Sequence, residues 1–293
     1  MSKPVVLVTG KNGQLGNELQ VLSASYPQFD FLFNDLPELD ITDQASLSAF
    51  FSEHKPSFCI NAGAYTAVDK AETDKEVALK VNAEAVGSLA ALCAEHGAGF
   101  VHVSTDYVFS GNGTSPYRED DPTDPVNYYG FSKLKGEELA LQNNPGTVII
   151  RTSWVYSFFG NNFVKTMRRL MLERDTLNVV NDQVGSPTYA ADLASVIMQV
   201  VDQLNNGKTN AAGIYHFSNE GIISWYDFAI AIRDLSSLAC IVHPVPSTSY
   251  LTPAKRPSYS GMSKEKIQNT FSIVVPDWKS SLEKCIRLLE KQS

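Results

Sequence analysis

The chain has few cysteines, few histidines and no excess of positive charge, and each shortage argues against a class of function. Its four cysteines stand alone without a CxxC pair, so no disulfide framework is expected. Its five histidines are scattered without metal-ligand spacing, and no protein-bound metal is expected. The net charge of -8 argues against a nucleic-acid partner or an anionic membrane surface.

Long apolar stretches are also missing. No apolar run approaches the ~20 residues that a membrane span needs. The opening segment, 1–8, lacks the apolar core of a signal peptide. We therefore expect a soluble, cytoplasmic protein. With 43% hydrophobic residues, 293 residues suffice for a large core, either in one α/β domain or in such a domain with an appended lobe.

Strand-like and helix-like segments alternate through the first half of the chain. Short apolar runs predict strands at 5–9, 29–33, 58–61, 100–103 and 147–150. Helical patterns lie between them, at about 15–22, 43–54, 73–96 and 127–142. This alternation is typical of the α/β class with a Rossmann-type, doubly wound parallel sheet.

The regularity fades after Arg151, which predicts a division of the chain. Residues 1-150 are expected to form a dinucleotide-binding Rossmann domain, to which segments from about 175-220 add. The less regular stretches at about 151-174 and 221-293, the second of them rich in proline, are expected to form a smaller C-terminal substrate-binding lobe.

A glycine-rich segment follows the first predicted strand and opens the first helix. Gly10, Gly13 and Gly16 have GxxGxxG spacing, a variant of the dinucleotide fingerprint. They permit a tight turn, close approach of a pyrophosphate and close helix–strand packing, while the amides at the helix start favour phosphate. A plain glycine turn is the alternative. The predicted dinucleotide contacts of this segment are Gly10, Lys11, Asn12, Gly13, Gln14, Leu15 and Gly16.

The choice of dinucleotide depends on the residues after the second predicted strand. Asp35 stands ~20 residues beyond the glycine loop, where an acidic residue binds the ribose 2′-hydroxyl. No arginine or lysine lies between Lys11 and Lys55, so a 2′-phosphate would rely on Lys11 or on distant groups. We expect NADPH or NADH, with a slight preference for NADH or weak discrimination. Asp40 and Ile41 are candidates to flank the adenine.

Two further loops lie where open α/β sheets bind ligands, at the carboxyl ends of strands. Small residues at 61–66 suit a backbone that passes close to a cofactor, and tight packing on the sheet is the alternative. Thr105 ends the strand before the next helix, and its hydroxyl can bind a substrate oxygen. The cofactor contacts predicted for the first loop are Ala62, Gly63, Ala64 and Tyr65.

Tyr129 and Lys133 stand four residues apart, which is about one helical turn. A lysine there can favour the ionised phenol and lower a tyrosine pKa that is ordinarily near ~10. Such a tyrosine can pass a proton to or from a sugar oxygen. An incidental surface pair has the same spacing, so the prediction of a catalytic site depends on Thr105, Tyr129 and Lys133 together.

The segments around these residues resemble the extended short-chain dehydrogenase/reductases and, among them, the dTDP-4-dehydrorhamnose reductase family. The most specific matches are Arg-Thr-Ser-Trp at 151–154 and Asp-Gln-x-Gly-x-Pro-Thr at 182–188. Departures occur at 157–159, at Ser110 and at 261–263. The other matching segments, in family order, are 10–16, 39–43, 61–69, 104–109, 129–137 and 256–257.

The resemblance implies reduction of the 4-keto group of dTDP-4-dehydro-L-rhamnose by NAD(P)H, the last step of dTDP-L-rhamnose synthesis. It implies that Tyr129 protonates the forming alkoxide, that Lys133 binds the nicotinamide ribose and tunes Tyr129, and that Thr105 positions the keto oxygen. It also implies a nucleotide-sugar pocket and is compatible with a homodimer. The substrate contacts that it implies, besides Thr105, are Thr66, Val68, Tyr107, Trp154 and Arg256.

Three other functions share parts of this pattern. A nucleotide-sugar 4,6-dehydratase needs an acidic residue beside Thr105 and Asp106, where this chain has Tyr107. A 4-epimerase agrees with the catalytic trio but not with the specific segments. The non-catalytic regulatory subunit of methionine adenosyltransferase resembles these reductases and stays open as an alternative. The start of the first strand at Val5, with no extension before it, favours the enzyme.

Overall fold

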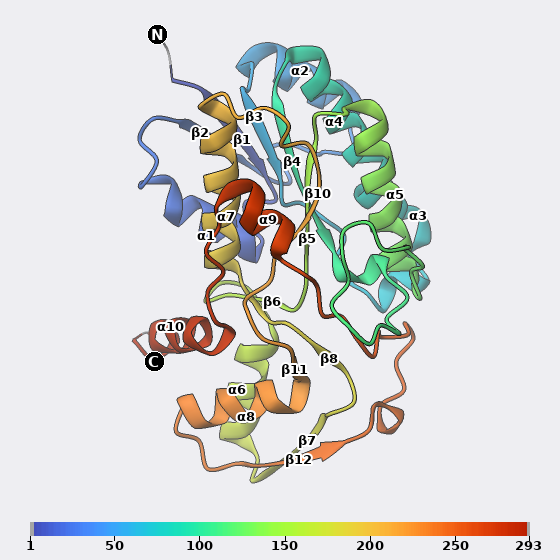
Figure 1. The fold of residues 1–293 in the computed structure, drawn as a ribbon, viewed down its shortest axis with the longest axis vertical. Helices are drawn as coiled ribbons and strands as arrows, with labels where there is room; N and C mark the ends of the chain where they lie inside the picture. The colour runs from blue at the N-terminus through green and yellow to red at the C-terminus, as the bar shows by residue number, and fades with distance from the viewer. Residues whose placement is uncertain (1–2, 292–293) are drawn as a thin grey trace.

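A parallel six-stranded sheet forms the upper part of the computed structural model, which describes residues 3–291 (Figure 1). The strand order is β10-β5-β4-β3-β1-β2, and every neighbouring pair is parallel. The chain order reverses between β1 and β3, which is where doubly wound sheets bind ligands. The strands are β1 Val5–Thr9, β2 Asp30–Asn34, β3 Phe58–Asn61, β4 Gly99–Thr105, β5 Val148–Thr152 and β10 Gly213–His216.

Helices cover both faces of this sheet. On one face α1 (Gln14–Ser23), α7 (Ala190–Asn205) and α9 (Glu265–Phe271) pack on an apolar core that includes Val6 and Val8. On the other face α2 (Gln44–His54), α4 (Ala85–His96) and α5 (Tyr128–Asn143) pack around Leu7. Alternate residues of β1 therefore enter different cores, which explains why its sequence is continuously apolar. The prediction of a Rossmann-type α/β fold is confirmed.

The predicted helix at 73–96 is interrupted. It consists of α3 (Lys75–Leu79), a π-helical turn η2 (Lys80–Glu84) and α4. Among the described residues, the stretch Lys75–His96 is the one helix long and apolar enough to cross a membrane by length and composition alone. Its most apolar window is 56% buried, and α4 packs on the sheet and on α5, so we interpret it as a core helix.

A smaller lobe lies below the sheet and has its own apolar core (Figure 1). Its helices are α6 (Phe163–Glu173), α8 (Trp225–Leu235) and α10 (Trp278–Glu290). The strands β7 (Thr176–Val180) and β12 (Ile241–Val245) pair in parallel at its base. Short pairs join β6 (Val155–Tyr156) to β9 (Thr188–Tyr189) and β8 (Val184–Gly185) to β11 (Ile223–Ser224).

Two segments pack in a different part of the molecule from the one that the sequence predicts. The strand β7 was expected to add to the Rossmann domain, but it pairs with β12 and packs in the core of the lower lobe. The helix α9 was expected in the lobe, but Ile267 and Phe271 pack on the sheet beside α7. Local periodicity does not reveal either partner, because both contacts join residues far apart in the chain.

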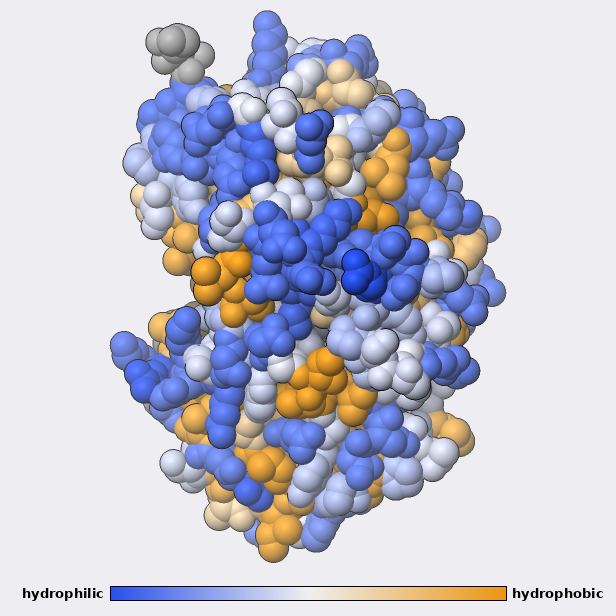
Figure 2. Space-filling view, in the orientation of Figure 1, coloured by the Kyte–Doolittle hydropathy of each residue, from blue (hydrophilic) through white to orange (hydrophobic). Residues whose placement is uncertain are grey.

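The remaining short helices are η1 (Lys70–Glu72), η3 (Asp106–Val108) and η4 (Ser247–Ser249). Two of them, η1 and η3, directly follow loops predicted to bind ligands. Figure 2 shows a surface that is hydrophilic over most of the visible face, with apolar residues gathered in separate small clusters.

Candidate functional site

A cavity of about 660 Å³ lies where the carboxyl ends of β1, β3, β4 and β5 meet the lower lobe. Residues 3–291 contain no group of three or more His, Cys, Asp or Glu side chains that could hold a metal ion. The cavity also contacts Asp106, Gly160 and Asn161, which the sequence did not single out. The predicted residues that line it are Gly10, Asn12, Gly13, Gln14, Leu15, Asp35, Ala62, Gly63, Ala64, Thr66, Val68, Thr105, Tyr107, Tyr129, Lys133 and Trp154.

The glycine turn has the geometry that a dinucleotide requires. Gly10 has φ +74, and a Cβ there would lie 2.6 Å from the backbone nitrogen of Gly63. The helix α1 begins after Gly13, with no side-chain cap and no acidic residue in its first turn. Its first amides are therefore free to face an anion, as a pyrophosphate would need. Gly16 is buried where α1 passes the turn.

A second cavity, of about 310 Å³, adjoins the turn and contacts Asp40, Ile41 and Tyr65, three of the predicted cofactor residues. The Asp35 carboxylate accepts hydrogen bonds from the backbone N–H groups of Asn12, at 3.1 Å, and Leu36, at 2.9 Å. It thereby joins the glycine turn to the end of β2.

Lys11 does not line either cavity. Its Nζ lies 2.8 Å from a carboxylate oxygen of Glu38, and the two side chains are 23% and 50% exposed. The nearest basic group that the sequence offered for a 2′-phosphate is therefore already paired with an acid.

The helix α5 brings Tyr129 and Lys133 to the cavity wall. Asn127 caps it by accepting a hydrogen bond from the Gly130 N–H at 2.8 Å. A Cβ at Gly130 would lie 2.1 Å from the Tyr107 carbonyl oxygen, so only glycine lets the first turn of α5 rest on η3. The rings of Tyr107 and Tyr129 meet edge to face with centroids 5.6 Å apart. The predicted trio is thus on one wall, with Thr105 at the end of β4.

The prediction that Lys133 lowers the pKa of Tyr129 is wrong for this structure. Burial raises the pKa of Tyr129 to about 12, the Thr105 hydroxyl lowers it, and the charge of Asp106 raises it further. Burial also lowers the pKa of Lys133 to about 8, although Glu137 acts in the opposite direction. Desolvation disfavours the charged form of each group, and it outweighs their helical proximity.

A buried polar row beneath Lys133 escaped the sequence analysis. Lys133 Nζ donates to the Val103 carbonyl at 2.7 Å and lies 3.3 Å from Nε2 of His102. The other ring nitrogen of His102 meets Asn61, and Asn61 accepts a hydrogen bond from the Thr9 hydroxyl at 2.6 Å. The backbone register places Thr9, Asn61 and His102 side by side on β1, β3 and β4. A polar residue near the end of each predicted strand was the signal available.

Asn82, in the π-helical turn η2, is a second buried residue that was missed. Its side chain accepts from the Tyr65 N–H at 2.8 Å and donates to the Tyr65 carbonyl and to the Ser132 hydroxyl, each at 3.0 Å. It therefore ties the loop after β3 to the helix that carries Tyr129.

The substrate residues implied by the resemblance separate into two groups. Thr66, Val68, Tyr107 and Trp154 line the cavity. Trp154 has a φ of 48, and its ring stacks on that of Trp225 in the lower lobe with centroids 3.5 Å apart. The indole is therefore part of the cavity wall at the junction with the lobe rather than an ordinary core side chain.

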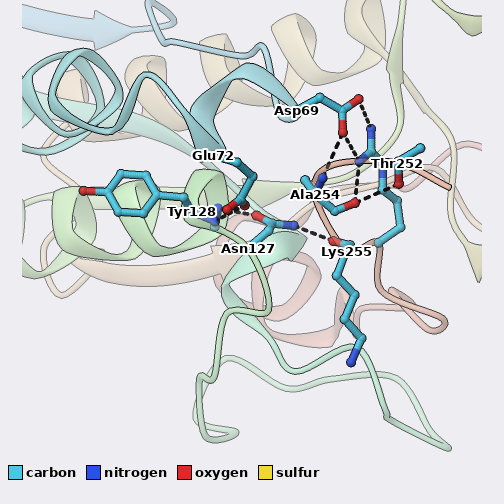
Figure 3. A network of polar contacts seen from close by, with 9 residues as sticks. Asp69, Glu72, Asn127, Tyr128, Thr252, Ala254 and Lys255 are labelled. Carbon is cyan, nitrogen blue, oxygen red and sulfur yellow. Dashed lines mark hydrogen bonds and ion pairs between the residues drawn. The ribbon is translucent and has the colours of Figure 1, made fainter.

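Arg256 does not line the cavity. Its guanidinium binds the Asp69 carboxylate through two nitrogens, at 2.6 and 2.8 Å, and the same carboxylate accepts the Ala254 N–H. Figure 3 shows the segment around Ala254 and Lys255 lying against Asp69 and Asn127, at the start of α5. This segment thereby connects the region after β12 to two loops of the site.

The fold and the cavity define a Rossmann-type oxidoreductase with a threonine, a tyrosine and a lysine at its centre. The family described as RmlD substrate binding domain matches residues 4–291. The chain belongs to this family.

Known proteins of similar sequence and structure carry a reductase name. A dTDP-4-dehydrorhamnose reductase of Aggregatibacter actinomycetemcomitans is 43% identical over 95% of this chain and 97% of its own length. The crystal structure of such a reductase from Clostridium acetobutylicum has a TM-score of 0.93 and 41% identity, over 98% of this chain and 99% of that one. The reductase from Bacillus anthracis, solved in complex with NADP, has a TM-score of 0.92 and 38% identity over the same shares.

Proposed function

We propose that this chain reduces the 4-keto group of dTDP-4-dehydro-L-rhamnose to dTDP-L-rhamnose, with NADPH or NADH as the reductant. The near full-length relatives named for this reaction support the substrate. The observation that supports the chemistry is one cavity that joins the glycine turn to Thr105, Tyr129 and Lys133. A dinucleotide fits at the turn, where the Gly10 cradle has no space for a side chain and the first amides of α1 are free.

The nicotinamide supplies the hydride when it is bound, and the chain supplies the proton. The pKa of Tyr129 is raised to about 12, so its phenol keeps its proton at neutral pH. A protonated phenol is the state that a donor to a forming alkoxide requires. We assign the orientation of the same oxygen to the hydroxyl of Thr105, which lines the cavity with Tyr129. These contacts act on charge that develops in the transition state, so their loss should lower kcat more than it raises KM.

Lys133 acts from inside the protein. Its Nζ is fixed by the Val103 carbonyl, and a charged Lys133 requires an unprotonated Nε2 on His102. We assign to it the binding of the nicotinamide ribose.

The test is a coupled assay that follows NADH or NADPH absorbance with the keto sugar nucleotide generated in situ. We expect oxidation of the cofactor by the wild type, and a fall of ~10²–10⁴ in turnover for Tyr129→Phe, the range for loss of a general acid. Tyr128→Phe is the matched control, because Tyr128 does not line the cavity. No oxidation with either cofactor would contradict the proposed reaction.

We further propose a cytoplasmic setting and a homodimer, with no nucleic-acid or membrane partner. The net charge of -8 supports the absence of an anionic partner. Light scattering of the purified protein measures the oligomeric state, and a mass of one chain at all concentrations would contradict the homodimer.

A further inference from the structure

Asp106 is a buried carboxyl in the cavity that the mechanism above does not use. Its side chain is 3% exposed and lines the cavity with Thr105 and Tyr129. Oδ1 accepts the Thr105 hydroxyl at 3.0 Å, while Oδ2 is buried without a hydrogen-bond partner. A carboxylate oxygen left in this state is costly, which indicates a functional reason for its retention.

The Thr105 hydroxyl has a single hydrogen, and in this structure Asp106 receives it. The same oxygen accepts the Tyr107 N–H at 3.2 Å. As long as Asp106 is ionised, Thr105 therefore has no hydrogen to offer a substrate oxygen. A protonated Asp106 reverses the bond, because the carboxyl O–H then donates to Thr105 Oγ1 and the threonine hydrogen is released toward the cavity.

We propose that Asp106 is a positioning residue that determines whether Thr105 donates its hydrogen bond to the substrate carbonyl or to Asp106. The inference rests on the proposed reduction of a keto sugar. No covalent bond forms or breaks in this step once Asp106 is protonated: the carboxyl keeps its proton, the Thr105–Asp106 hydrogen bond reverses, and a second hydrogen bond forms from Thr105 to the substrate carbonyl. Tyr129 remains the proton donor to the forming alkoxide.

The surroundings of Asp106 make both states accessible. Burial raises its pKa to about 7, while the Thr105 hydroxyl and the nearby polar groups of Ser260 and of the backbone at Asp106 and Tyr107 lower it. The titratable groups around it are Tyr107 on η3, Tyr129 and Lys133 on α5, and the Arg256–Asp69 pair beyond Tyr107. An ionised Asp106 also raises the pKa of Tyr129, so the neutral form serves both hydroxyl donors.

The first test is the pH profile of kcat/KM. In the wild type we expect the rate to fall as pH rises through about 7, where Asp106 ionises. The amide of Asp106→Asn imitates the protonated carboxyl, so the fall should move upward to the pKa of about 8 that Lys133 has. A variant whose profile falls at the same pH as the wild type overturns the inference. Whether the wild type oxidises the cofactor at low pH tests the proposed reaction, and this result does not depend on the pH at which kcat/KM falls.

The second test needs no turnover and keeps the inference open to refutation if Asp106→Asn does not fold. Difference infrared spectra of the wild type should show a carboxylic-acid band that disappears through about pH 7. In Thr105→Val this midpoint should rise, because the lost hydroxyl favours the carboxylate, while Thr105→Ser should retain the wild-type midpoint. Equal midpoints in Thr105→Val and the wild type, or no band that titrates, would refute the inference.

Discussion

The pKa values of the ionisable residues in the cavity depend more on burial than on the charges of their neighbours. Burial is the largest cause of the shift in the pKa of Tyr129, of Lys133 and of Asp106. In each case it favours the neutral form. The spacing of Tyr129 and Lys133 predicts that they share a helix face, and the structure agrees. It does not predict the pKa, because desolvation depends on every neighbour that excludes water.

The raised pKa of Asp106 predicts a stability that depends on pH. The carboxyl has an ordinary pKa of 3.8 and a pKa of about 7 in the fold, so the folded state holds the proton that the unfolded chain loses. The raised pKa does not lower the free energy of unfolding below about pH 4. The loss of stability grows between the two pKa values and is complete above about pH 7. Asp106→Asn should therefore raise the free energy of unfolding at high pH relative to low pH, by up to about 4 kcal/mol.

Urea denaturation on either side of this window measures the effect. Asp120→Asn, at an exposed position of the loop before α5, is the matched control. The same difference in unfolding free energy between Asp106→Asn and the wild type at both pH values would contradict the prediction.

At the scale of elements, loops that contain glycines and small residues form the wall of the cavity where we propose that the cofactor binds. The turn between β1 and α1 meets the loop after β3 so closely that Gly10 and Gly63 nearly touch. The sequence predicts each loop from composition. The sequence does not predict the interruption of the helix at 73–96. In η2, Asn82 forms hydrogen bonds with Tyr65 and Ser132, and these contacts join segments that are distant in the chain.

The pairing of Lys11 with Glu38 predicts how the chain treats the two dinucleotides. Lys11 is the cation offered to a 2′-phosphate, and Glu38 competes for it. Glu38→Gln should lower the KM for NADPH several-fold and leave the KM for NADH nearly unchanged, because only NADPH carries the additional phosphate. Lys11→Ala should raise the KM for NADPH more than that for NADH.

Steady-state kinetics with both cofactors measures the KM values of the wild type and of the two variants. Lys55→Ala, at the C-cap of α2 and outside both cavities, is the control for loss of a lysine. A parallel change in the two KM values for either variant would show that Lys11 does not recognise the 2′-phosphate.

At the scale of the whole molecule, the cavity is formed by two cores that are built from interleaved segments. The chain leaves the sheet after β5, returns for α7 and β10, and returns again for α9. The segment from Thr252 to Arg256 lies against the turn after β3 and the start of α5 (Figure 3). The lower part of the molecule thus contributes both the Trp154–Trp225 stack and a support for the helix of Tyr129.

The Asp69–Arg256 pair predicts how this segment contributes to substrate binding. If Arg256 binds the substrate diphosphate, Arg256→Gln should raise the KM for the nucleotide sugar more than Asp69→Asn does. If the pair only fixes the segment, the two variants should raise KM equally. Both side chains are partly exposed, 24% and 40%, so we expect a coupling energy of at most about 1 kcal/mol in a double-mutant cycle.

We expect the first of these outcomes, since the diphosphate offers the guanidinium a second anionic partner. KM and kcat for the single and double variants measure it, and Arg118→Gln, an exposed arginine on the loop before α5, is the control. Equal KM values for Arg256→Gln and Asp69→Asn would remove Arg256 from the substrate contacts.

The sequence by itself determined the sheet, the glycine turn and the set of residues that we propose carry the chemistry. These features are local: a continuously apolar strand, a glycine after it, and a tyrosine and a lysine one turn apart. Only the tertiary structure decided that β7 packs in the lower lobe and α9 on the sheet. It also decided that His102 and Asn82 lie beneath the site and that Arg256 is paired with Asp69. It also decided the acid–base behaviour of Tyr129 and Asp106, because the exclusion of water is a property of all the segments that surround a side chain.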